Sequence, residues 1–81
     1  MNTSFVEAHA VACHVDFTED ELIVALVDGR KVSVPLVWFP RLTNATRSQL
    51  ENYEFLDDGE GIHWPDLDED LSVRGLLLGN H

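Results

Sequence analysis

Side chains that could do chemistry gather in one stretch near the end of the chain. His63, Trp64 and Pro65 are followed by an acidic segment, residues 66–70. Its acids are Asp66, Asp68, Glu69 and Asp70. A histidine held beside a carboxylate has its charged form stabilised and can exchange protons near neutral pH. His63 is therefore the candidate catalytic residue, although a histidine next to tryptophan and proline is more often a structural hydrogen-bonding group.

The acidic segment also offers oxygen ligands of the kind that Mg²⁺ or Ca²⁺ prefers, but the spacing of a calcium-binding loop is absent. His9, Cys13 and His14 lie close in sequence, whereas a zinc site needs three or four converging ligands. No phosphate-binding glycine loop, dinucleotide motif or serine–histidine–aspartate pattern is present. We therefore expect no metal and no cofactor, and interpret the acids as residues at the positive end of a short helix.

A second unusual stretch is W-F-P-R-L, residues 38–42. Arg41 could form a charge-assisted hydrogen bond with the acidic segment and so tie the two stretches together. Trp38, Phe39, Trp64 and Arg41 are residue types that dominate the centres of protein interfaces. In so short a chain the aromatic residues are equally suited to the core.

The first half of the chain predicts a three-stranded antiparallel meander. Residues 10–17 alternate, which places Val15, Phe17 and Cys13 on one face and makes Cys13 a core residue. Residues 22–27 form a β-branched-rich run that suits a central strand with both faces covered. Asp28 and Gly29 favour a two-residue hairpin turn, after which residues 30–34 return antiparallel.

The second half predicts short helices and a second hairpin. Thr46 and Gln49 have capping-box spacing, so a helix should cover residues 47–52. Residues 53–56 and 62–64 should pair around a turn in which Gly59 and Gly61 permit a tight reversal. Ser72 or Asp70 should cap a last helix that ends at Gly79 and packs its leucines on the sheet. The expected fold class is α+β: a small antiparallel sheet, made of the meander and the second hairpin, with a short crossover helix and a C-terminal helical turn.

The length and the net charge of the chain limit the functions that it can have. The 81 residues predict a single domain, residues 1–81, with residues 1–7 less ordered. A chain this short buries only roughly 60% of its unfolded surface, so the core is thin and a partner or homo-oligomer is a reasonable expectation. Fifteen acidic residues against five basic ones give a net charge of −10, which disfavours direct nucleic-acid binding unless the basic residues cluster. The four candidates for such a cluster are Arg30, Lys31, Arg41 and Arg47.

A single cysteine, the absence of a signal-peptide pattern and the absence of a long apolar run predict a cytoplasmic protein without a membrane segment.

Three motifs resemble a bacterial family known as domain of unknown function 2442. They are W-F-P-R-L at residues 38–42, A-T-x-x-Q at residues 45–49, and G-x-G-I-H-W-P-x-L-D-E-D-L-S-V-x-G-L-L at residues 59–77. The family has no assigned activity. Many of its members look like one half of a two-gene cassette, so the resemblance implies a toxin–antitoxin arrangement with a small protein partner.

Together these observations predict a small acidic cytoplasmic protein-binding module, antitoxin-like within a two-protein cassette. The alternative is a small enzyme or a ligand- or metal-binding domain that uses His63 with Arg41 and the acidic segment. The candidate residues of the interaction site are those of the motif core: Trp38, Phe39, Pro40, Arg41, His63, Trp64, Pro65, Asp68, Glu69 and Asp70.

Overall fold

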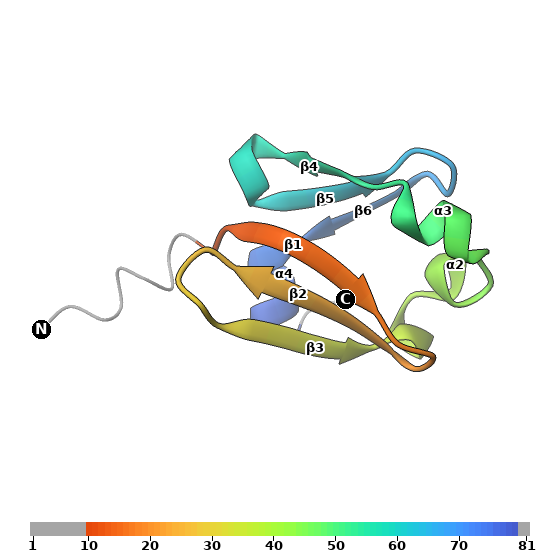
Figure 1. Ribbon diagram of the computed structural model, residues 1–81, viewed down its shortest axis with the longest axis horizontal. Helices are drawn as coiled ribbons and strands as arrows, with labels where there is room; N and C mark the ends of the chain where they lie inside the picture. The colour runs from red at the N-terminus through yellow and green to blue at the C-terminus, as the bar shows by residue number, and fades with distance from the viewer. Residues whose placement is uncertain (1–9, 80–81) are drawn as a thin grey trace, which may run out of the picture.

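The computed structural model describes residues 10–79, which form two three-stranded antiparallel sheets joined by short helices (Figure 1). The first sheet has the order β1-β2-β3, with β1 (Ala12–Phe17), β2 (Glu21–Leu26) and β3 (Lys31–Pro35). The second has the order β4-β5-β6, with β4 (Glu54–Leu56), β5 (Gly61–Trp64) and β6 (Glu69–Ser72). The helical elements are η1 (Leu36–Trp38), α2 (Pro40–Thr43), α3 (Arg47–Glu51), η2 (Asp57–Gly59) and α4 (Val73–Leu78). The α+β fold class is confirmed, and the expectation for residues 1–7 lies outside the described residues.

A bulge in β1 decides which of its side chains enter the core. Ala12 pairs with Leu26 and His14 with Ala25, so Cys13 is an extra residue without a position of its own in the ladder. The bulge breaks the alternation, because the inserted residue shifts every later side chain by one position. Val15 and Phe17 are buried as predicted, but the prediction that Cys13 belongs to the core is wrong: its side chain is exposed.

The β2–β3 hairpin forms where predicted, with a longer turn. The Leu26 amide donates to the Arg30 carbonyl, which leaves a three-residue loop instead of the expected two-residue one. Gly29 has a φ of +97°, whereas Asp28 keeps a negative φ and cannot form the mirror-image turn that needs two positive values. The expectation that both faces of β2 are covered is also wrong, because Ile23 and Ala25 remain half-exposed while Leu22 and Val24 are buried.

The predicted capping box is present at the start of α3. The Gln49 amide donates to the Thr46 hydroxyl, and the Thr46 amide donates to the Gln49 side chain. Pro40 occupies the first turn of α2, where its missing amide costs nothing. Pro40 therefore favours the start of α2, and the capping box favours the start of α3.

The second sheet contains a strand that the sequence does not reveal. Glu69 and Asp70, expected at the start of a helix, instead belong to β6, which pairs with β5 from Gly61↔Ser72 to Trp64↔Glu69. Residues 65–68 form the turn between them, and Asp68 takes a φ of +53°. The last helix, α4, begins only at Val73; Ser72 caps it by accepting from the Gly75 amide, and Gly79 ends it in the left-handed conformation. The predicted second hairpin is therefore two strands of a three-stranded sheet.

The core is shared by both sheets and centres on Trp64. This side chain is fully buried, its indole N–H donates to the Leu50 carbonyl at 3.0 Å, and its ring packs edge-on against Phe17 at 6.4 Å between centroids. The sheets also meet at Gly59, where the backbone packs against Ala12 of β1. Trp64 and Gly59 thus hold the second sheet against the first.

Candidate functional site

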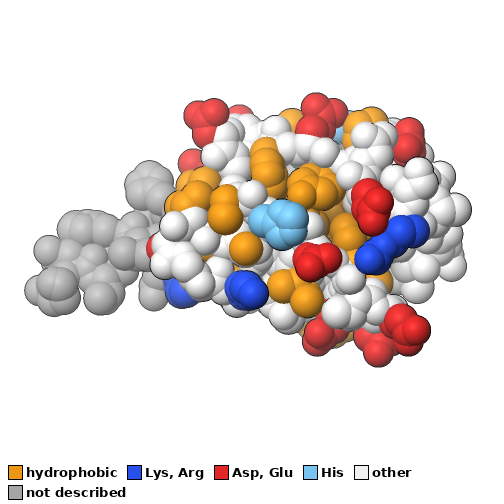
Figure 2. Space-filling model, viewed as in Figure 1, with side chains coloured by type: hydrophobic (Ala, Val, Ile, Leu, Met, Phe, Trp, Pro, Cys, Tyr) orange, Lys and Arg blue, Asp and Glu red, His pale blue; other side chains and the backbone are white. Residues whose placement is uncertain are grey.

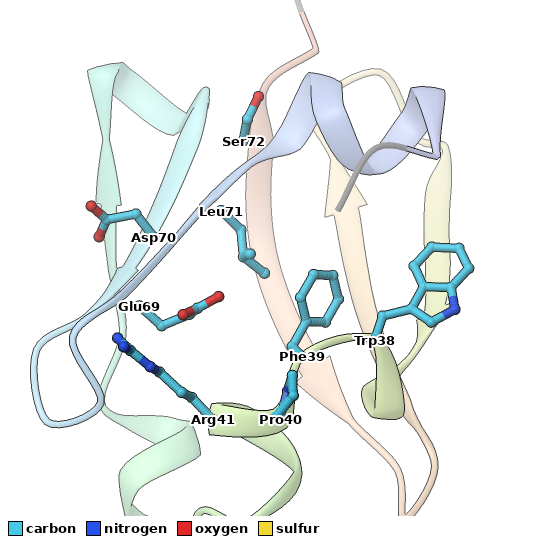
Figure 3. A pocket seen from close by; sticks show the side chains of 8 residues that line it. All are labelled: Trp38, Phe39, Pro40, Arg41, Glu69, Asp70, Leu71 and Ser72. Carbon is cyan, nitrogen blue, oxygen red and sulfur yellow. The ribbon is translucent and has the colours of Figure 1, made fainter.

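An open groove runs between β6 and residues 38–41 (Figure 3). Its volume is about 420 Å³. One wall is formed by all four residues of β6, and the other by the W-F-P-R part of the first motif. The lining residues are Trp38, Phe39, Pro40, Arg41, Glu69, Asp70, Leu71 and Ser72. This surface, called the β6 groove below, brings together the two motifs that were singled out in the sequence.

The wall made by residues 38–41 is anchored to the core. Phe39 is buried and Leu42 behind it is fully buried. The Thr43 hydroxyl donates to the carbonyls of Leu36 and Phe39, which links η1 to α2 across the bend. The backbone of this wall is therefore fixed by core packing and hydrogen bonds, independently of any ligand.

Arg41 joins the two motifs, as predicted, mainly through main-chain atoms. Its Nη1 donates to the Asp68 carbonyl at 2.6 Å and to the Leu67 carbonyl at 3.4 Å. The Asp68 carboxylate lies at 3.9 Å from the same nitrogen and is 97% exposed, so this ion pair contributes little to stability. Arg41 thus holds the turn before β6 in place, with Nη1 donating to carbonyl oxygens of that turn.

The outer edge of β6 has no neighbouring strand among residues 10–79. The Val73 amide donates to the Glu60 carbonyl, and ladder bonds in antiparallel sheets recur at every second residue. This phase directs the amides of Leu71 and Glu69 toward β5 and those of Asp70 and Ser72 toward the outer edge. Among residues 10–79, no backbone partner meets these two outer amides. Within the described residues, the β6 groove therefore follows a sheet edge that has no strand partner.

His63 lies on the other face of the same sheet. It stands in the middle strand between Glu54 of β4 and Asp70 of β6, and its Nδ1–H donates to an Asp70 carboxylate oxygen. Its side chain is 28% exposed. His63 is not among the residues that line the β6 groove. Arg41 does not contact His63: Arg41 bonds the carbonyls of Leu67 and Asp68, whereas His63 bonds the Asp70 carboxylate.

The Asp70 hydrogen bond raises the pKa of His63 above its ordinary value of 6.5. Coulombic attraction by Asp70, Glu54 and Asp68 acts in the same direction, and partial desolvation opposes it. Because the folded pKa lies above the unfolded one, the stabilisation is complete below a pH of about 6.5 and is lost as the pH rises through the folded pKa. The His63–Asp70 hydrogen bond therefore contributes more to the free energy of unfolding on the acidic side of neutrality.

Replacing Asp70 with asparagine is expected to lower the pKa of His63, measured from its ring proton resonances in an NMR pH titration. Asp66→Asn is the matched control, because it removes the same charge from the same segment without touching His63. An unchanged His63 midpoint in Asp70→Asn, or an equal decrease in both variants, would contradict the assignment of the shift to the Asp70 hydrogen bond.

The remaining candidates divide between core and surface. Trp64 and Phe39 are core residues, Trp38 is half-buried, and Pro65 begins the turn that leads to β6. The sequence did not identify Leu71 and Ser72 as site residues, because the four-residue run E-D-L-S is too short to predict a strand by itself. Its one local signal is the turn-forming P-D-L-D sequence before it.

The four basic residues considered for a cluster lie at two ends of the molecule, and the fifth, Arg74, belongs to α4. Arg30 and Lys31 sit at the β2–β3 turn, whereas Arg41 and Arg47 belong to α2 and α3 at the opposite end (Figure 1). Arg30 pairs with Asp28, and Arg47 with Glu51. Figure 2 likewise shows Lys and Arg side chains at separate margins of one face, with acidic side chains around them.

Within residues 10–79 no group of three or more His, Cys, Asp or Glu side chains is arranged to hold a metal ion.

No helix in the described part of the chain is long and apolar enough to cross a membrane.

Two small antiparallel sheets, short helices and a groove along the edge of β6 define residues 10–79 as a small α+β domain. The model of the family described as "Protein of unknown function (DUF2442)" matches residues 12–81, and the chain belongs to that family.

Two solved structures are similar to this one. A protein of unknown function from Rhodospirillum rubrum ATCC 11170 has 34% sequence identity, a TM-score of 0.74 and 89% coverage of each chain. The uncharacterised protein CV0863 from Chromobacterium violaceum has 23% identity and a TM-score of 0.74, over 96% of this chain and 74% of the other, and shows the shared fold alone. No curated protein of established function matches the sequence.

Proposed function

We propose that the protein is a small acidic cytoplasmic protein-binding module and that the β6 groove is its binding surface. The observation that carries this proposal is the composition of the groove. Its two walls come from residues 38–41 and β6, which are distant in sequence and belong to the two most distinctive motifs. Its volume of about 420 Å³ lies within the range of ligand-binding clefts, roughly 300–1,000 Å³.

Charge favours a basic partner. The net charge is −10, and Glu69, Asp70 and the adjacent Asp68 place part of it at the groove. Complementary potentials speed association and select the partner. Arg41 offsets only part of this field, because it brings one positive charge against three acidic side chains. A small basic protein encoded beside this one, as in an antitoxin-like pair, fits these properties.

The alternative is a small enzyme or ligand-binding domain at His63. The His63–Asp70 pair favours it, since a carboxylate-bound histidine can exchange protons. The pair lies on a sheet face, however, and Arg41 is directed at the turn before β6 and not at His63. The nearest hydroxyl along β6, that of Ser72, already caps α4. We therefore rank the binding module first.

Site-specific photocrosslinking tests the proposal. A photoreactive phenylalanine analogue is placed at Pro40, which lines the groove, is exposed, and occupies a helix position whose amide is free in any case. The same analogue at Val27, an exposed residue in the β2–β3 turn, is the control. In the native cells we expect one defined protein crosslinked from position 40 and not from position 27, with loss of the adduct when unlabelled protein is added in excess. Equal labelling at both positions, or none at position 40, would reject the groove as a binding surface.

A further inference from the structure

We infer that the β6 groove takes an extended segment of a basic partner, which pairs with β6 as a fourth strand of the second sheet. The inference rests on the proposed function and specifies how the same surface is used. Strand addition to a free sheet edge is a common mode of peptide recognition, in which main-chain hydrogen bonds supply affinity and alternate side chains supply specificity.

The main-chain groups that an added strand would bond already lie along the groove. The groove lining on one side is the whole of β6, from Glu69 to Ser72, so the cavity follows the strand and not a single side chain. The amides of Asp70 and Ser72 point to this edge. In an added antiparallel strand, the residue opposite Asp70 would form two hydrogen bonds with it, one through its amide and one through its carbonyl. The amide and carbonyl of the next residue would point away from β6.

The side-chain rows of the sheet specify the sequence of the added strand. The inner row runs Phe55, Ile62, Leu71, and in Figure 3 the Leu71 side chain points toward Phe39 across the groove. The position beside Leu71 therefore requires an apolar side chain, since cross-strand neighbours on one face are in contact.

Acidic residues occupy the two neighbouring positions of β6. Asp70 ends the outer row that starts at Glu54 and passes through His63. Glu69 lies on the inner face of the sheet, in the next row, beside Trp64. Figure 3 shows these two carboxylates on opposite sides of the strand. Each favours Lys or Arg next to it, because opposite charges in direct cross-strand positions stabilise and like charges destabilise. The added strand should therefore carry an apolar residue followed by two basic ones when it runs antiparallel, and the reverse order when it runs parallel.

Acidic residues at an edge also prevent unwanted pairing between copies of a protein. That role alone predicts no affinity for a basic strand, and it predicts self-association when the acids are removed. The two explanations therefore differ in what a short basic peptide does.

Two capped heptapeptides serve as probes: Thr-Val-Leu-Arg-Lys-Val-Thr for the antiparallel arrangement and Thr-Val-Lys-Arg-Leu-Val-Thr for the parallel one. Binding is followed by NMR titration and by amide hydrogen exchange of the protein. We expect one peptide to bind and to slow exchange of the Asp70 and Ser72 amides by about tenfold or more, because these groups gain hydrogen-bond partners. The Leu71 amide, already in the β5–β6 ladder, is the internal control.

Methylation of the peptide backbone separates strand pairing from charge attraction. For the antiparallel peptide, N-methylation of the central arginine removes the amide that faces Asp70 and should weaken binding by about tenfold or more, the effect of one well-placed hydrogen bond. N-methylation of the adjacent leucine, whose amide faces away, should change the affinity by less than about threefold. In the protein, Glu69→Gln should weaken binding, and Glu19→Gln in the β1–β2 turn is the charge-matched control.

The inference is overturned if neither peptide binds, if both methylated peptides bind equally well, or if the exchange of Asp70 and Ser72 does not change. Self-association of Glu69→Gln without peptide binding by the native protein would assign the acids to edge protection. Crosslinking from position 40 together with any of these results would leave the binding module in place and reject only the added strand.

Discussion

Replacement of Gly59 with alanine is expected to destabilise the protein by about 2–5 kcal/mol, a large part of the stability of a domain of this size. A β-carbon at this position would lie 2.6 Å from the Ala12 carbonyl oxygen and 2.8 Å from a Val11 methyl group. Overpacking of this kind costs roughly 1–3 kcal/mol. The φ of +105° adds about 1–2 kcal/mol for any residue with a β-carbon. Urea denaturation followed by far-ultraviolet circular dichroism measures the loss.

Gly29→Ala separates the two contributions. Gly29 also has a positive φ, +97°, but nothing lies within 4 Å of an added β-carbon there. Its substitution should therefore cost only the conformational part, about 1–2 kcal/mol. If the two variants lost equal free energy of unfolding, the close approach of Gly59 to β1 would not be a determinant of stability.

Trp64→Ala is expected to lower the free energy of unfolding by about 3–5 kcal/mol, the range for removing a large aromatic side chain from a core. Trp64 is fully buried, packs against Phe17 and Tyr53, and bonds the Leu50 carbonyl. The change therefore loosens the second sheet from the first and from α3 together. Chemical denaturation monitored by circular dichroism gives the difference, with Trp38 fluorescence as a second probe of the same transition.

Trp64→Phe distinguishes packing from hydrogen bonding. Phenylalanine fills most of the space but removes the indole donor from the Leu50 carbonyl, which should cost about 1–3 kcal/mol. Equal losses in the alanine and phenylalanine variants would show that the hydrogen bond dominates, and a negligible loss in both would contradict the central position of Trp64 in the core.

The second sheet shows why local sequence patterns predict only part of the fold. The turn at Gly59 and the β4–β5 hairpin follow from turn-forming residues, and both were predicted. The strand after Pro65 was not, because four residues with two acids look the same at a helix start and on a sheet edge. Only the register with Gly61–Trp64 makes Glu69–Ser72 a strand. The β6 groove is formed by that strand, so the groove could not be predicted from the sequence either.

The candidate residues divide in the same way. Contact between Arg41 and the acidic segment was predicted, yet its partners are main-chain carbonyls, which no sequence pattern marks. The pairing of His63 with Asp70 follows from their facing positions on β5 and β6. The exposed position of Cys13 follows from one inserted residue in β1.

The sequence by itself determined the meander, the Thr46 capping box, a last helix capped at Ser72 or Asp70 and the helix end at Gly79, because each depends on residues a few positions apart and on intrinsic turn and helix chemistry. The tertiary structure alone decided the bulge at Cys13, the third strand of the second sheet, the two walls of the β6 groove and the partner of His63. These depend on which distant segments pair and in what register, and a shift of one residue in that register moves every side chain to the other face.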